Sequence, residues 1–101
     1  MNSKALKYRQ FKLPTSIIKQ GAKYIAYSPS LDISTVGNTE KKATERFYEL
    51  ADIFFEELIN SGNLENVLSE LGWKIEKSVW NPPKIISKKT IGIKIPLGVS
   101  A

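Results

Sequence analysis

The carboxylates are the residues of this chain whose type and spacing could support catalysis. Asp32 stands beside a strand break in "SPSLD", and a second set recurs every three or four residues: Glu45, Glu49, Asp52 and Glu56. Two-metal nuclease chemistry requires several carboxylates to converge on one point, whereas a single aspartate in a turn usually bonds the neighbouring backbone. We therefore predict no catalytic residues, no metal site, no cofactor and no enzymatic activity.

Histidine and cysteine are absent from the 101 residues. The chain therefore lacks the usual general base, the usual zinc ligands and a thiol nucleophile, which leaves only carboxylates, lysines, tyrosines and hydroxyls for chemistry. A chain without cysteine suits a reducing cytoplasm. No apolar stretch approaches the roughly eighteen residues that span a membrane, and the charged start has no apolar segment after it. We expect a cytoplasmic protein with no membrane partner.

The net charge of +5 is divided unevenly along the chain. Residues 1–31 carry six bases and no acid, residues 32–70 carry nine acids and three bases, and residues 71–101 carry six bases and one acid. A uniformly basic nucleic-acid binder would not place its acidic residues together in its main helix. Any contact with nucleic acid should therefore be weak and come from the two basic ends, or from a complex with a partner.

Two alternating segments near the N-terminus predict a β-hairpin. Residues 10–20 form the first strand, and the second begins at Tyr24 after a turn at Gly21. Pro14 cannot donate a ladder hydrogen bond, so it places the first strand at a sheet edge or marks a bulge. Pro29 ends the second strand, and "DISTVG" supplies a short third one.

A long amphipathic helix is predicted next. Gly37 allows a sharp turn, Asn38 or Thr39 caps the helix, and the helix ends near Asn60. Its apolar stripe should face the sheet and consists of Ala43, Phe47, Leu50, Phe54 and Leu58. The four acidic residues spaced along this helix lie almost opposite that stripe, where they face water or a cationic partner.

Three further apolar residues extend the helix stripe beyond what one sheet face requires. They are Tyr48, Phe55 and Ile59. Large exposed apolar patches are uncommon on monomers, so we expect these residues to be covered, either by the rest of the chain or by a second copy of it.

The last third of the chain contains one short helix and further strand patterns. "NLENVLSELG" predicts a helix capped by Asn63 and ended by Gly72, and "WKIEKSVW" is a strand candidate. "KTIGIKIPL" predicts a closing strand with Ile91, Ile93 and Ile95 on one side. That strand could join a sheet edge of its own chain or of a second subunit.

The elements together predict one α+β domain over residues 1–101, with a core of about 10–72 and a C-terminal strand extension over 73–101. The expected order is β-β-β-α-α-β: an antiparallel sheet of three N-terminal strands plus one or more C-terminal strands, packed on one long helix with a short second helix. No internal repeat or Gly/Ser linker marks a second domain.

Several ordered motifs resemble the HicB-like antitoxin family. "YIAYSPSL" resembles the strand-Pro-x-Leu signature of that family, "TVGNT" resembles its Gly-polar-Thr turn, and "EKKATERFYELADIFFEEL" is similar to the helix that follows. The resemblance covers residues 10–60, with "LSELGW" also similar to longer members. It implies a reduced RNase H-like domain without an active site, which neutralises a small basic ribonuclease toxin of the HicA type.

The resemblance also helps to assign the expected interfaces. The toxin would contact Tyr27, Pro29, Leu31 and Asp32, together with the acidic residues of the long helix. A homodimer would use Tyr48, Phe55, Ile59, Ile91, Ile93 and Ile95. Many family members add a DNA-binding element, but no helix pair suited to the major groove follows Gly72 here, so we expect no specific operator binding by the chain alone.

Two other functions fit the same residues. The chain could be an orphan interaction or oligomerisation domain that has no toxin partner, or a weak nucleic-acid binder acting through its basic ends. Lys84, Lys88, Lys89 and Lys94 could follow phosphates, but lysines on an exposed strand also protect a sheet edge from aggregation. Trp73 and Trp80 favour core or interface packing over base stacking.

Overall fold

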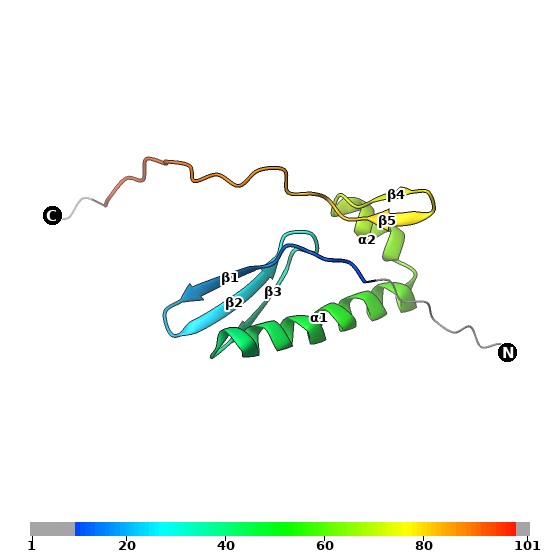
Figure 1. Ribbon diagram of the computed structural model, residues 1–101, viewed down its shortest axis with the longest axis horizontal. Helices are drawn as coiled ribbons and strands as arrows, with labels where there is room; N and C mark the ends of the chain where they lie inside the picture. Colours follow the sequence, from blue (N-terminus) through cyan, green and yellow to red (C-terminus); the bar gives the residue numbers. More distant parts are fainter. Residues whose placement is uncertain (1–9, 99–101) are drawn as a thin grey trace.

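The computed structural model describes residues 10–98 and has the predicted α+β architecture (Figure 1). The elements in chain order are β1 (Ser16–Gln20), β2 (Lys23–Ser28), β3 (Ile33–Gly37), α1 (Glu40–Ser61), α2 (Leu64–Glu70), β4 (Lys74–Glu76) and β5 (Val79–Asn81). The predicted order β-β-β-α-α-β is confirmed. The C-terminal strands β4 and β5 form a separate two-stranded sheet and do not join the N-terminal sheet as predicted. No helix of residues 10–98 is long and apolar enough to cross a membrane.

The N-terminal sheet is antiparallel, with β2 between β1 and β3. Its register places Ile25 opposite Ile18 on β1 and opposite Val36 on β3. Gly21 adopts a φ of 61° in the two-residue turn between β1 and β2, a conformation that glycine accepts without steric cost. The predicted hairpin is therefore confirmed, and β1 and β3 are the edges of this sheet.

The first strand is shorter than predicted, since β1 begins at Ser16 and residues 10–15 lie outside any strand. Pro14, which has no amide hydrogen to donate, precedes the first paired residue. Phe11 therefore does not belong to the sheet. Its ring instead meets the Trp73 ring edge to face, at a centroid distance of 5.5 Å.

Helix α1 begins and ends where the sequence predicts, to within one residue. Thr39 is the N-cap, and its Oγ1 accepts a hydrogen bond from the Lys42 amide at 3.0 Å. Gly62 ends the helix in the left-handed conformation, with φ of 74°. One side of α1 packs against β2 and β3 of the sheet (Figure 1).

Gly37 brings β3 and α1 close together, and the reason differs from the predicted sharp turn. Its φ is not in the left-handed region. A Cβ at this position would lie 2.5 Å from the amide nitrogen of Ala43, closer than atoms can approach. The same contact region is held by the Thr35 hydroxyl, which donates to the Ala43 carbonyl at 2.7 Å, and by Arg46 Nη1, which donates to the Val36 carbonyl at 2.8 Å.

The core is small and lies where the sheet, α1 and the region around α2 meet. Its buried apolar residues are Ala26, Leu31, Ala43, Phe47, Leu68 and Trp73. Trp73 is 3% exposed, and its Nε1 donates to the Ser30 carbonyl at 2.8 Å across 43 residues of sequence. This bond attaches the C-terminal part of the fold to the turn between β2 and β3.

The segment "WKIEKSVW" forms a hairpin, not the single strand predicted for it. Lys77 and Ser78 both have positive φ, at 53° and 64°, and reverse the chain between β4 and β5. Two successive left-handed residues match the twist of a tight hairpin turn. Trp80 packs partly buried against the core, as the sequence predicts for a tryptophan of this kind.

Residues 82–98 form no helix or strand, so the predicted closing strand is not paired within the described chain. Figure 1 shows this segment leaving β5 and running as one extended chain on the side of the sheet opposite α1. The Cα radius of gyration is 17.9 Å. A compact domain of this length has a radius of gyration of about 13 Å, so this molecule is more extended than a compact domain. We call residues 82–98 the tail.

Candidate functional site

The carboxylates do not gather into a metal-binding cluster in residues 10–98. No group of three or more acidic side chains lies close enough to hold a metal ion in this part of the chain. The Asp32 carboxylate accepts a hydrogen bond from the Tyr27 hydroxyl at 3.0 Å. Its role in the structure is to receive this bond beside the strand break.

The end of β2 and the turn that follows it bring together four residues of the predicted toxin interface. The Asp32 amide donates to the Ser28 carbonyl at 2.8 Å, and Asp32 adopts a φ of 54°, which aspartate tolerates better than most residues. Pro29 is exposed and Tyr27 half-buried. Leu31 is 2% exposed, so it packs in the core and has little surface to offer a partner.

The Tyr27–Asp32 hydrogen bond changes the pKa of the Tyr27 phenol. The hydrogen bond that Tyr27 donates to Asp32 raises the pKa of the phenol above its ordinary value of 10.0, with smaller contributions from burial and from the Asp32 charge. The hydrogen bond requires the protonated phenol, so Asp32 extends the pH range over which Tyr27 remains a donor. The pair links the end of β2 to the residue that precedes β3.

The acidic residues of α1 form the exposed stripe that the sequence predicts. Glu45, Glu49, Asp52 and Glu56 are all exposed. Glu45 lies 3.6 Å from Lys42 in an ion pair at the surface, an arrangement that contributes little to stability. We call these four residues the acidic stripe, and most of its charge is available to a partner.

The three residues predicted to need a cover differ in their surroundings. Phe55 is partly buried against the core, and its ring meets the Trp73 ring at 6.4 Å. Tyr48 is 69% exposed and Ile59 is 54% exposed. The chain therefore covers one of the three, and Tyr48 and Ile59 remain open on α1.

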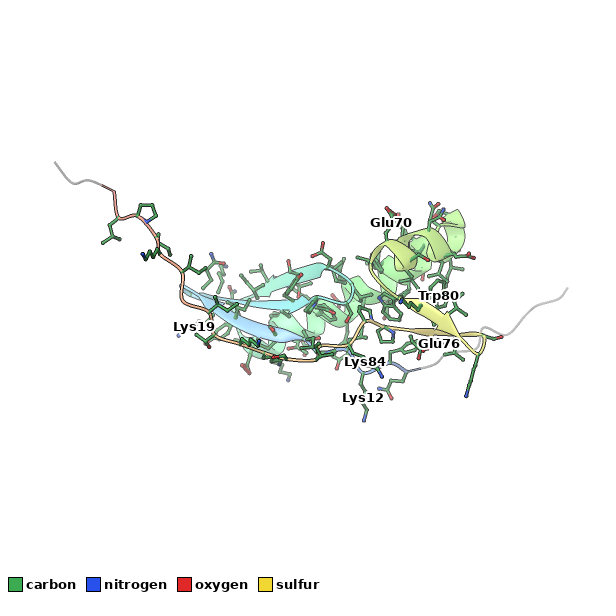
Figure 2. All side chains as sticks on the ribbon, turned by 90° about the horizontal axis from the view of Figure 1, so that it is seen from above. Lys12, Lys19, Glu70, Glu76, Trp80 and Lys84 are labelled. Atoms are coloured by element: carbon green, nitrogen blue, oxygen red, sulfur yellow. The ribbon has the colours of Figure 1, made fainter. Side chains whose placement is uncertain are left out.

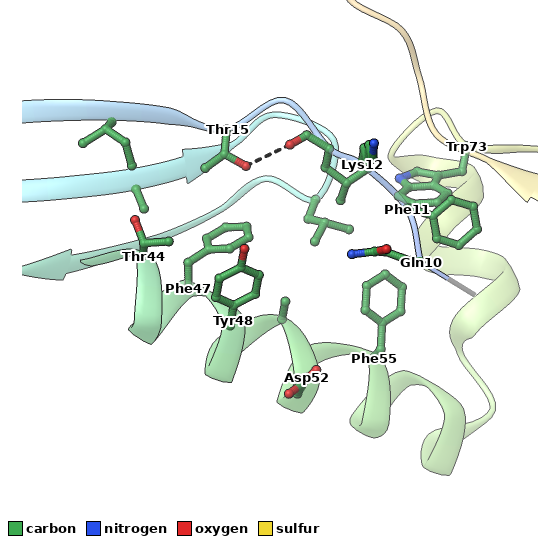
Figure 3. Close-up of a pocket in the computed structure, with 15 residues that line it drawn as sticks. Gln10, Phe11, Lys12, Thr15, Thr44, Phe47, Tyr48, Asp52, Phe55 and Trp73 are labelled. Atoms are coloured by element: carbon green, nitrogen blue, oxygen red, sulfur yellow. Dashed lines mark hydrogen bonds between the residues drawn. The ribbon is translucent and has the colours of Figure 1, made fainter. Parts of the chain in front are cut away.

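A groove lies between α1 and the segment that leads into β1, and the sequence analysis did not identify it. It has a volume of about 580 Å³. Ile17 of β1 lines one side, Phe47, Tyr48 and Phe55 of α1 line the other, and Trp73 lies at one end (Figure 3). The exposed position of Tyr48 was the signal available in the sequence, since this residue lies outside the stripe that faces the sheet.

The groove exists because α1 does not reach under the whole sheet. The helix packs on β3 and β2, whereas the edge strand β1 extends beyond it. All five residues of β1 are exposed. Helix α1 therefore leaves most of the helix side of β1 uncovered.

The tail carries the remaining predicted interface residues. Ile91, Ile93 and Ile95 are 72%, 75% and 73% exposed. Lys84, Lys88, Lys89 and Lys94 are exposed as well. Figure 2 labels Lys84 at the start of the tail, beside the hairpin that carries Trp80 and Glu76. The structure thus does not bring the tail isoleucines together with Tyr48, Phe55 or Ile59.

Comparison with other proteins yields no assignment. The chain matches no protein-family model, and neither the curated proteins nor the solved structures contain a match to it.

Proposed function

We propose that this chain is a cytoplasmic, non-catalytic binding module that neutralises a small basic ribonuclease of the HicA type by covering its surface. The proposal follows from the HicB-like motifs of the sequence. The observation that carries it is the acidic stripe: four carboxylates on one exposed helix face, of which Glu45 alone forms an ion pair within residues 10–98. An acidic surface that meets a basic toxin speeds association and contributes to the choice of partner, because the two charges attract each other.

The turn between β2 and β3 supports the same proposal. Pro29 and Asp32 are exposed at this turn, and the hydrogen bond from Tyr27 holds the Asp32 carboxylate in place. A rigid contact loses less entropy on binding than a mobile one. The distribution of the acidic residues along an outer helix face favours protein binding over two-metal catalysis, which requires converging carboxylates.

The test is inhibition of a purified HicA-type toxin encoded beside this chain. We expect the chain to bind the toxin and stop its cleavage of RNA. The double variant Glu45→Lys/Glu49→Lys should weaken binding by about tenfold or more, because it reverses two charges of the acidic stripe. The matched control is Glu65→Lys/Glu70→Lys, which makes the same charge change at two exposed residues of α2.

Each result of this test has a clear meaning. Failure of the chain to inhibit the toxin would refute the proposal. Equal weakening by both double variants would show that total charge, and not the acidic stripe, governs binding. Inhibition that is weakened only by the α1 variant supports the proposal.

A second candidate function is homo-oligomerisation, with or without a toxin. The exposed isoleucines of the tail and the exposed Tyr48 of α1 favour it, because apolar surface of this extent is uncommon on a monomer. We propose a homodimer as the simplest closed assembly. Specific DNA binding by the chain alone is not proposed, since the seven-residue α2 carries Glu65 and Glu70 and no base.

A further inference from the structure

We propose that residues 91–95 of one copy add as a fourth strand to the free edge of β1 in a second copy, with the three isoleucines filling the groove between β1 and α1. The inference rests on the proposed homodimer and defines its contact. It does not depend on the toxin.

The edge of β1 offers unpaired backbone to an added strand. Strand β1 pairs only with β2 among the described residues. In an antiparallel strand, alternate amide and carbonyl groups point away from the paired neighbour, so the outer groups of β1 are open to a partner strand. The tail segment 91–95 has the same length, five residues, as β1.

The side-chain pattern of the tail matches the groove. In a strand, residues 91, 93 and 95 point to one side and residues 92 and 94 to the other. The isoleucine side chains would then point into the groove and pack against Ile17, Tyr48 and their apolar neighbours. Gly92 and Lys94 would face water on the other side of the sheet. Pro96 cannot donate a ladder hydrogen bond and would end the added strand.

The added strand would also cover the most exposed aromatic residue of α1. A fourth strand beside β1 lies over the part of α1 that the three-stranded sheet leaves open. Tyr48 lines the groove at this position and is 69% exposed. Burial of such apolar surface is the main driving force for strand addition, with backbone hydrogen bonds setting the register.

The charges of the two surfaces are complementary. Asp52 lines the groove on the α1 side, and the remaining residues of the acidic stripe lie next to it along the helix. The tail carries Lys88, Lys89 and Lys94 and no acid. The tail can therefore approach the groove without repulsion. Lys88 and Lys89, which precede the added strand, can lie near the carboxylates at the rim, whereas Lys94 faces water on the other side of the sheet.

The position of the tail selects a second copy as the occupant. The tail leaves β5 on the side of the sheet opposite α1, whereas the groove lies on the α1 side (Figures 1 and 3). Pro82 and Pro83 restrict the backbone where the tail begins. A reciprocal exchange between two copies fills both grooves by the same contact, which gives a closed two-fold dimer.

The test begins with the mass of the full chain by light scattering, measured over a range of concentrations. We expect twice the chain mass of 11.3 kDa. Ile93→Asp should raise the dimer dissociation constant by about tenfold or more, because it places a carboxylate in an apolar groove beside Asp52. Its control is Ile86→Asp, at a tail residue that is 96% exposed and lies outside the added strand.

A second pair of variants tests the groove itself. Ile17→Lys should weaken the dimer as Ile93→Asp does, because Ile17 lines the groove. Ile18→Lys is its control, since the neighbouring residue of β1 points to the opposite side of the sheet. Thermal unfolding at low concentration reports whether the four variants keep the same monomer fold.

Mixing the two damaging variants gives the most specific result. In a mixed dimer, the Ile17→Lys chain has an intact tail and the Ile93→Asp chain has an intact groove. One of the two contacts therefore remains undamaged. The mixture should therefore dimerise more tightly than either variant alone, and this result supports reciprocal exchange.

Three outcomes would overturn the inference. A dimer that neither Ile93→Asp nor Ile17→Lys weakens uses another surface, which leaves the homodimer in place and removes the strand exchange. A monomer whose tail amides are protected from hydrogen exchange docks the tail on its own chain. A monomer with unprotected tail amides excludes both the strand exchange and the homodimer. It does not bear on toxin inhibition, which is measured separately.

Discussion

Strand β2 and the tail share one sequence pattern and have opposite structural outcomes. Both alternate β-branched or aromatic residues with smaller or polar ones, in "IAYS" of β2 and in "IGIKI" of the tail. Strand β2 pairs with β1 on one side and β3 on the other, and its Ala26 is fully buried. The tail pairs with nothing in the described chain, and its isoleucines are exposed.

The difference shows that an alternating pattern specifies a strand only when a partner edge is within reach. The tight turn at Gly21 brings β1 beside β2 after two residues, so little chain entropy is lost on pairing. The tail follows Pro82 and Pro83 and pairs with no strand edge within the described residues. Its pattern remains available to an edge on another molecule.

The largest expected effect is on the folded part of the chain. Trp73→Ala should lower the free energy of unfolding by about 3–5 kcal/mol, the typical cost of removing a buried tryptophan. It removes the contact with Phe11 and the hydrogen bond to Ser30. Urea unfolding followed by circular dichroism measures the loss.

The tail supplies the control for this prediction. Ile86→Ala truncates a large apolar residue that is almost fully exposed, so stability should change by less than about 0.5 kcal/mol. A comparable loss in both variants would mean that the tail contributes to the core, and the contrast between the two regions would fail.

The next effect compares two glycines that each lie in an alternating segment. Gly37→Ala should destabilise the protein by about 1–3 kcal/mol, the usual cost of forcing extra atoms into a packed contact, because its Cβ would collide with the backbone of α1. Thermal unfolding detects the change. Gly92→Ala adds the same methyl group where nothing lies within 4 Å.

The Gly92 control also bears on the strand exchange. A methyl group at residue 92 points away from the groove in the added strand, so Gly92→Ala should leave both stability and dimer mass unchanged. If Gly37→Ala left the stability as unchanged as Gly92→Ala does, the conclusion that β3 approaches α1 closely at Gly37 would be wrong.

The smallest effect concerns the pH dependence of the turn after β2. Because Asp32 raises the pKa of Tyr27 in the folded state, the pair stabilises the fold below pH 10 and loses this contribution as pH rises through the folded pKa. Asp32→Asn should lower the pKa of Tyr27 toward 10.0. An ultraviolet absorbance titration measures the shift, and Tyr27→Phe identifies which transition belongs to this residue.

Much of the fold could be predicted because its signals are local. Thr39 caps α1 and Gly62 ends it, and both assignments depend on residues within a few positions. The turn at Gly21 follows from adjacent residues in the same way. The hairpin β4–β5 was missed because both of its turn residues adopt positive φ, and such turns favour Asn, Asp and Gly over the Lys77 and Ser78 found here.

The candidate site was predicted less completely. The exposed acidic stripe follows from helical periodicity alone. Leu31 was placed at an interface from its position in a motif, but it packs in the core. The groove was missed because its two walls come from β1 and α1, about thirty residues apart, and its depth depends on how far α1 extends under the sheet.

The sequence by itself determined the α+β class, the ends of α1 and the two faces of that helix, because periodicity, caps and turn residues act over a few positions. The tertiary structure alone decided which apolar residues are covered. Burial of Trp73 depends on a bond to Ser30, 43 residues away. Tyr48 is exposed because α1 overlaps only slightly with β1. The tail is exposed because of the direction that it takes after β5. Such contacts join distant segments, and their free energy depends on geometry that no local pattern contains.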